Sequence, residues 1–156
     1  MIKPRSKPHS SDLRKGRVSE PGRIYHIRTS VEPRRPLFTD LLLGREVVGT
    51  LRFQHERGHV ESLAFVLMPD HLHWLIRLGD SASLAQIVRS VKSFSAHRIN
   101  ARLGTTGQVW QDGYFDRALR AEDDIKCIAR YIVANPLRAR ICARVADYPL
   151  WDAIWV

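Results

Sequence analysis

The chain has 156 residues, of which 44% are hydrophobic, and this is enough for one domain with an ordinary buried core. Its formal net charge of +9 favours a polyanionic partner, nucleic acid before an anionic membrane surface. The sequence shows no apolar stretch typical of a signal peptide or a membrane span. It holds only two cysteines, Cys127 and Cys142, which is too few for a disulfide framework. We therefore expect a cytoplasmic protein with reduced, mostly buried thiols.

The N-terminal 22 residues are polar and basic, with Pro and Ser interspersed. This composition predicts a flexible arm over residues 1–22, followed by a single domain over residues 23–156. The arm is either a solubilising tail or a segment that lies on the phosphates of a nucleic acid. The sequence favours neither interpretation.

The segment RIYHIRTS alternates between apolar and polar residues and predicts a strand over residues 23–30. Tyr25 and Ile27 then lie on one face of this strand. His26 and Arg28 lie on the opposite face.

A helix is predicted next, over residues 39–56, with Thr39 or Asp40 as its N-cap. The segment HVESLAFVLMPD follows, and HLHWLIRLG comes directly after it. Together they predict a β-hairpin that turns near Pro69 and Asp70. The unbroken apolar run of its first strand indicates a central position in a sheet.

Apolar residues at helical spacing predict a second helix over residues 82–102. The segment at 109–120 predicts a strand or an irregular hairpin. A third helix is predicted over 122–134, with acidic residues in its first turn, and it ends at Asn135 and Pro136. The order strand, helix, strand, strand, helix, strand, helix predicts an α+β fold, a ferredoxin-like antiparallel sheet with helices packed on one face.

His71 and His73 are separated by one residue on the second strand of the hairpin. Both imidazoles therefore lie on one face, opposite an apolar set that includes Leu72 and Trp74. Two imidazoles aimed at one point are typical of half a metal site, and His26 could approach them on a neighbouring strand. The alternative is a pair of ordinary histidines on an open sheet face.

Tyr131 lies at the boundary between the apolar stripe and the solvent side of the third helix, where Arg130 is also found. A tyrosine in this position is either functional or an amphipathic packing residue. Asn135 follows about one turn later on the same flank. Its carbonyl oxygen could bind a divalent ion, or its side chain could cap the helix before Pro136.

Four motifs occur in a fixed order along the chain. They are MPDHLHWLI (68–76), VWQDGYFDRALR (109–120), RYIVANPLRARIC (130–142) and DYPLWDA (147–153). With PGRIYHIRTS before them, they resemble the bacterial REP-associated tyrosine transposases, a group within the single-tyrosine HUH transposases of the insertion-sequence type. The resemblance covers residues 21–155 and implies the same ferredoxin-like fold.

The resemblance also implies roles for four side chains. His71 and His73 match the two histidines of the HUH motif. Asn135 matches the polar residue that completes the family's metal site, and Tyr131 matches the nucleophile. The family cleaves single-stranded DNA next to small hairpins, uses Mg²⁺ or Mn²⁺, and exists as monomers or homodimers. A second catalytic tyrosine motif is not recognisable, which implies one cleavage per active site.

The basic residues are expected to hold the DNA backbone. Those assigned to this role are Arg28, Arg89, Lys92, Arg98 and Arg130. Aromatic side chains at Tyr114 or Phe115 could stack on unpaired bases, whereas Trp110 is better explained as part of the core.

The resemblance thus implies a metal-dependent single-stranded DNA endonuclease and strand transferase that forms a 5′-phosphotyrosine intermediate. A tyrosine phenol ordinarily has a pKa of about 10, so a cation or base must help to activate it. Arg130, Lys92 and a metal-bound water are the candidates. The alternatives are a non-catalytic DNA-hairpin-binding protein derived from a transposase and a hydrolytic metal phosphodiesterase, in which water would replace Tyr131 as the nucleophile.

Overall fold

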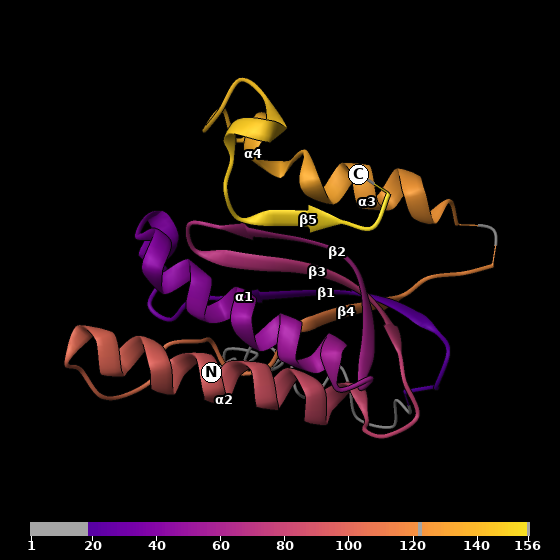
Figure 1. Cartoon of the computed structure of the whole chain (residues 1–156), viewed down its shortest axis with the longest axis horizontal. Helices are drawn as coiled ribbons and strands as arrows, with labels where there is room; N and C mark the ends of the chain where they lie inside the picture. Colours follow the sequence, from indigo (N-terminus) through magenta and orange to yellow (C-terminus); the bar gives the residue numbers. More distant parts are fainter. Residues whose placement is uncertain (1–18, 122, 156) are drawn as a thin grey trace, which may run out of the picture.

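The computed structural model describes residues 19–121 and 123–155 (Figure 1). The strands are β1 (Ile24–Ser30), β2 (Val60–Met68), β3 (His71–Leu78), β4 (Phe115–Ala118) and β5 (Trp151–Ala153). The helices are α1 (Leu41–Glu56), α2 (Leu84–Leu103), α3 (Ile125–Val133) and the short α4 (Asn135–Arg138), with 3-10 turns at Leu37–Thr39 and Val145–Asp147. All strand pairs are antiparallel, in the order β4-β1-β3-β2-β5, which confirms the predicted α+β class.

Local sequence signals explain where the two long helices begin and end. The Asp40 carboxylate caps α1 by accepting a hydrogen bond from the backbone N–H of Leu42 at 3.0 Å. Ser83 and Gln86 form a reciprocal capping box at the start of α2. Gly104 ends α2 in the left-handed conformation, with φ of +63°, which glycine adopts without a steric penalty.

One face of the sheet carries the apolar set predicted for β3. Leu72, Trp74 and Ile76 are each at most 1% exposed. The indole N–H of Trp74 donates to Ser62 Oγ at 2.9 Å, so its one polar group is satisfied inside the core. Helices α1 and α2 pack against each other and lie on the other side of the strands from α3 (Figure 1).

The opposite face is also partly covered, which corrects the prediction that the helices pack on one face only. Leu75 lies in the same row as the two histidines of β3, yet it is 0% exposed, and Val66, opposite His73 on β2, is also 0% exposed. Helix α3 packs on β2, β3 and β5 and lies apart from α1 and α2 (Figure 1). The physical reason is that apolar residues on both faces of the central strands need burial.

Three details differ from the sequence-based expectations. Strand β5 was not predicted as a strand, because three residues give too short an alternation. Helix α3 begins at Ile125 with Asp124 as its N-cap, so the acidic residues precede the helix. The cysteines are unpaired as expected, but Cys127 is exposed and Cys142 only half-buried.

Most of the predicted arm, residues 1–18, lies outside the described residues. The four residues that follow are attached to the domain. The backbone N–H of Gly22 donates to the Leu78 carbonyl at 2.7 Å, and Ser19 Oγ accepts from the Leu84 N–H at 3.1 Å. In the described part of the chain, no helix combines the length and the apolar character needed to cross a membrane.

Candidate active site

Three histidines gather on the face of the sheet that α3 partly covers. His71 and His73 lie on β3, with ring centroids 5.0 Å apart. His26 approaches from β1, as the sequence suggested, because β1 and β3 are paired antiparallel and His26 lies opposite Leu75. Its Nε2 is 2.9 Å from Nδ1 of His73, so the two rings share one hydrogen bond.

Asp70, the last residue of the hairpin turn, is bound to the first histidine of the pair. The His71 Nδ1–H donates to Asp70 Oδ1 at 2.7 Å, and Arg34 forms an ion pair with the other carboxylate oxygen at 2.9 Å. Burial raises the pKa of Asp70, but the hydrogen bonds from His71 and Arg34 outweigh it and leave the pKa below its usual value. The carboxylate is therefore ionised and can only accept.

The pKa values of all three imidazoles are lowered, and burial is the largest cause in each. The pKa of His73 falls to about 3, because burial is reinforced by repulsion from the protonated forms of His26 and His71 and from the charges of Arg28 and Arg138. The three rings are accordingly neutral at physiological pH. A neutral imidazole with a free lone pair is the form that binds metal ions.

Tyr131 lies on α3 and is 59% exposed, beside the buried Ile132. The guanidinium carbon of Arg138 is 3.7 Å from the centroid of the Tyr131 ring. The charge of Arg138 also contributes to lowering the pKa of His73. Because α3 packs on the histidine face and Arg138 is near both groups, the phenol and the histidine pair lie on the same side of the molecule.

Asn135 is the first residue of α4 and is half-buried. The C-cap of α3 is Ala134, so Asn135 does not occupy the capping position suggested by one reading of the sequence. Its Nδ2 donates to the carbonyl of Ile132 at 2.8 Å. The Oδ1 atom is therefore the one that could meet a cation.

The donors around the histidine pair fit a hard or borderline divalent ion. Across residues 19–121 and 123–155, His, Cys, Asp and Glu form no group of three arranged to hold a metal. Asn135 was outside that set of residue types, and its amide oxygen is of the kind that could join two imidazoles in binding a divalent ion. Both histidines use Nδ1 in hydrogen bonds. The carboxylate acceptor leaves the Nε2 lone pair of His71 available for a metal, whereas Nε2 of His73 is available only when His26 is the acceptor.

The residues predicted to bind DNA divide between the two faces. Arg28 is exposed on β1, and its charge is among the causes that lower the pKa values of all three histidines. Arg130 is exposed on α3. The three cations of α2 lie on the helix layer of the other face. They are Arg89, Lys92 and Arg98.

Two of these α2 cations are engaged within the fold. Lys92 Nζ donates to the backbone carbonyls of Gln111, at 2.8 Å, and Gly113. Arg98 forms an ion pair with the buried carboxylate of Glu46. The structure thus does not bring the α2 cations to the histidines.

Three arginines near the histidines were missed in the sequence analysis. Arg34 reaches the site through Asp70, Arg117 is opposite His26 in the pairing of β1 with β4, and Arg138 stacks on Tyr131. Two of them lie inside the conspicuous motifs at 109–120 and 130–142. Their proximity depends on strand register and on the bend between α3 and α4, which have no local signal in the sequence.

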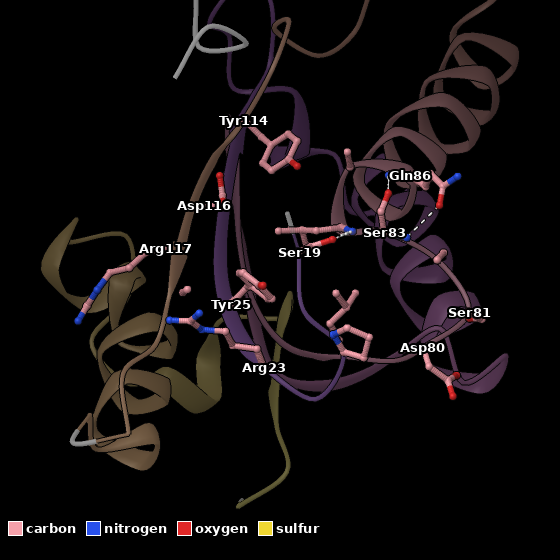
Figure 2. A pocket seen from close by; sticks show the side chains of 16 residues that line it. Ser19, Arg23, Tyr25, Asp80, Ser81, Ser83, Gln86, Tyr114, Asp116 and Arg117 are labelled. Atoms are coloured by element: carbon pink, nitrogen blue, oxygen red, sulfur yellow. Dashed lines mark hydrogen bonds between the residues drawn. The ribbon is translucent and has the colours of Figure 1, made fainter. Parts of the chain in front are cut away.

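A cavity of about 970 Å³ lies elsewhere, between β1, β4 and the start of α2. Its wall includes Tyr25, Tyr114 and Arg23 (Figure 2). None of the three histidines and neither Tyr131 nor Asn135 lines it. Although the cavity is large, the residues of the candidate active site do not line it, so we do not assign the chemistry to it.

The three aromatic residues of the 109–120 segment have different environments. Trp110 is 4% exposed and donates to Ser95 Oγ at 2.9 Å, which confirms its place in the core. Tyr114 is half-buried against the cavity, and Phe115 is 62% exposed. Phe115 is thus the one most accessible for stacking.

Comparisons with known proteins agree with this architecture. The REP-associated tyrosine transposase of Escherichia coli (strain K12) is 26% identical over 88 residues, which are 55% of this chain and 50% of that protein. The match thus spans half of the relative's length. A solved structure of a REP-associated tyrosine transposase bound to a REP hairpin superposes with a TM-score of 0.70 at 19% identity, covering 86% of this chain and 79% of that one.

A second solved structure, of a protein from Deinococcus radiodurans R1, has a TM-score of 0.53 at 18% identity and covers 90% of this chain and 92% of that one. At these identities the structural matches establish the fold. The family model of the IS200-like transposases matches residues 21–135, most of the described domain. The resemblance seen in the motifs is therefore confirmed, and the chain belongs to the IS200-like transposase family.

Proposed function

We propose that this protein is a metal-dependent single-stranded DNA endonuclease and strand transferase that forms a 5′-phosphotyrosine at Tyr131. The observation that carries the proposal is that α3 packs on the face of the sheet bearing His71 and His73. The exposed phenol and the neutral imidazoles are then available to the same phosphate. Arg138, near both, supplies a fixed positive charge beside it.

The metal ligands in this proposal are Nε2 of His71, Nε2 of His73 and Oδ1 of Asn135. A bound Mg²⁺ or Mn²⁺ would neutralise the anionic phosphate oxygens and polarise the phosphorus. Imidazole donors favour Mn²⁺ in affinity, whereas the abundance of Mg²⁺ in cells favours the other ion. The protein's own side chains would orient the phosphate and the phenol for the reaction.

In the reaction, the Tyr131 oxygen forms a bond to phosphorus while the bond from phosphorus to the 3′ oxygen breaks. The phenolic proton is lost to a base or to solvent, and the departing 3′ oxygen takes up a proton. The DNA 5′ phosphate is then linked to the protein as a phosphodiester of tyrosine. A 3′-hydroxyl can attack this link and restore a DNA phosphodiester, so rejoining needs no nucleotide cofactor.

The substrate we propose is single-stranded DNA next to a hairpin, bound in the cytoplasm by a monomer or a homodimer. The structural relative is bound to a REP hairpin. The net charge of +9 suits a nucleic acid. Arg28, Arg34 and Arg138 are all exposed close to the histidines, where a phosphate must lie for attack by Tyr131.

A cleavage assay tests the proposal. Incubation with a hairpin oligonucleotide carrying single-stranded flanks and Mn²⁺ is expected to yield a covalent adduct, with the DNA located on Tyr131 by mass spectrometry. Tyr131→Phe is expected to form none, whereas the matched control Tyr114→Phe should form it normally. Cleavage at the wild-type rate by Tyr131→Phe, without an adduct, would instead identify a hydrolytic phosphodiesterase.

A second candidate function is hairpin binding without cleavage. The hairpin in the relative's structure favours it, since binding alone explains that complex. It predicts that the wild-type protein retains the oligonucleotide in a mobility-shift assay but gives no adduct with either metal ion. The adduct measurement therefore separates the two candidates.

A further inference from the structure

Each histidine of the pair has a hydrogen-bond partner on its Nδ1 atom. We propose that Asp70 and His26 are positioning residues, which hold the Nδ1–H of His71 and His73 respectively and so leave Nε2 of both rings for the metal ion. The inference rests on the proposed function, because it assumes that a metal binds this pair. It concerns residues to which neither the sequence motifs nor the comparisons gave a role.

For His71 the chemistry fixes the tautomer. The Asp70 carboxylate is 2.7 Å from Nδ1 and can only accept, so the proton of the neutral ring lies on Nδ1. The lone pair is then on Nε2. Arg34 holds the carboxylate by its second oxygen at 2.9 Å, so the acceptor is itself fixed in place.

For His73 the partner is an imidazole, which can donate or accept. If the Nδ1–H of His73 donates to His26, the Nε2 lone pair of His73 is free for a metal. If the Nε2–H of His26 donates instead, Nε2 of His73 carries the proton and cannot bind one. Metal binding therefore requires His26 to be the acceptor, with its own proton on Nδ1.

The position of His26 is a consequence of the strand pairing. The ladder between β1 and β3 is continuous from Ile24 opposite Arg77 to Ser30 opposite His71. His26 thus lies one row from His73 on the same face, and the 2.9 Å contact is held by backbone hydrogen bonds on both sides of it. A partner held in this way gives the ring of His73 one orientation as well as one tautomer.

The tautomer can be measured in the metal-free protein by long-range ¹H–¹⁵N NMR of the histidine side chains. We expect His73 to carry its proton on Nδ1 in the wild type and largely on Nε2 in His26→Phe, which keeps a ring but cannot accept. His26→Gln offers an amide oxygen and is expected to restore the Nδ1–H form. His59 serves as an internal reference, because its Nδ1 is 2.7 Å from Gln54 Oε1 and it precedes β2, outside the ladder between β1 and β3. A wild-type His73 with its proton on Nε2 overturns the proposal.

The second measurement is Mn²⁺ affinity by isothermal titration. His26→Phe is expected to bind Mn²⁺ about 10- to 100-fold more weakly than the wild type, and His26→Gln within a few-fold of it. His97→Phe, a change of an exposed histidine on α2, is the matched control and should bind normally. Wild-type affinity in a folded His26→Phe overturns this inference alone. Failure of the wild-type protein to bind Mn²⁺ overturns the metal site of the proposed function and this inference with it.

Discussion

The guanidinium of Arg138 stacks on the ring of Tyr131, with its carbon 3.7 Å from the ring centroid. The same side chain donates a hydrogen bond of 2.6 Å to the backbone carbonyl of Tyr131. The two residues lie on α4 and α3, and the bend between these helices brings them together. Arg138 therefore holds an exposed phenol in one orientation and places a positive charge beside it.

Replacing Arg138 should slow cleavage without abolishing it. We expect Arg138→Ala to form the covalent adduct about 10- to 100-fold more slowly, because the phenol loses its orientation and the phosphate loses a cation. The rate of adduct formation in Arg138→Lys should lie between those of Arg138→Ala and the wild type, since lysine keeps the charge but not the planar stacking. Single-turnover adduct formation measures this, with Arg52→Ala on α1 as the control. An unchanged rate in Arg138→Ala would remove this residue from the site.

Asn135 should matter through its side-chain oxygen. In Asn135→Ala the proposed metal site loses one ligand, so the Mn²⁺ concentration for half-maximal cleavage should rise at least about tenfold. Asn135→Asp retains an oxygen donor and should need less metal than Asn135→Ala. Titration of activity against Mn²⁺ distinguishes the two variants, and an identical requirement in all three proteins would contradict the ligand role.

DNA binding should depend more on the histidine face than on α2. We expect Arg28→Ala to weaken binding of a hairpin oligonucleotide and to lower the slope of log affinity against log salt by about one. Arg89→Ala, on the opposite helix layer, should change both quantities little. Binding isotherms at several salt concentrations test this. Equal losses in the two variants would assign α2 to DNA contact, as its sequence first suggested.

The stability of the metal-free protein should fall in acid because of the histidines. The pKa of His73 is about 3 in the fold and about 6.5 when unfolded, so the unfolded chain binds more protons between these values. The contribution of His73 is fully present above pH 6.5 and is lost as the pH falls towards 3. Urea unfolding between pH 4 and 8 should therefore show a shallower pH dependence in His73→Gln than in the wild type. An equal slope would show that His73 is not buried as described.

The docking of α3 on the sheet should depend on its buried stripe. Ile132 is 0% exposed, and Ile132→Ala should lower the free energy of unfolding by about 2–5 kcal/mol, from lost burial and the cavity left behind. Lys126→Ala, on the exposed side of α3, should change it by less than about 0.5 kcal/mol. Urea denaturation measures both, and a neutral Ile132→Ala would mean that α3 is not held by this contact.

The sequence by itself determined most of the elements and located the residues of the proposed site. Alternation and helical spacing located β1, the β2–β3 hairpin, α1 and α2, because the period of apolar residues reflects which face is buried. The short motifs identified the histidine pair, Tyr131 and Asn135, and the family they indicated is the one whose model matches the chain.

The tertiary structure decided which groups meet. Helix α3 covers the histidine face because apolar side chains such as Val66 and Leu75 need burial there, and a pattern along one strand does not show which helix supplies it. The contacts of His26 with His73 and of Arg117 with His26 follow from strand register between distant segments. The sequence suggested that the α2 cations bind DNA, but the packing places them on the layer opposite the histidines. There Arg98 forms an ion pair with Glu46, and Lys92 donates to backbone carbonyls.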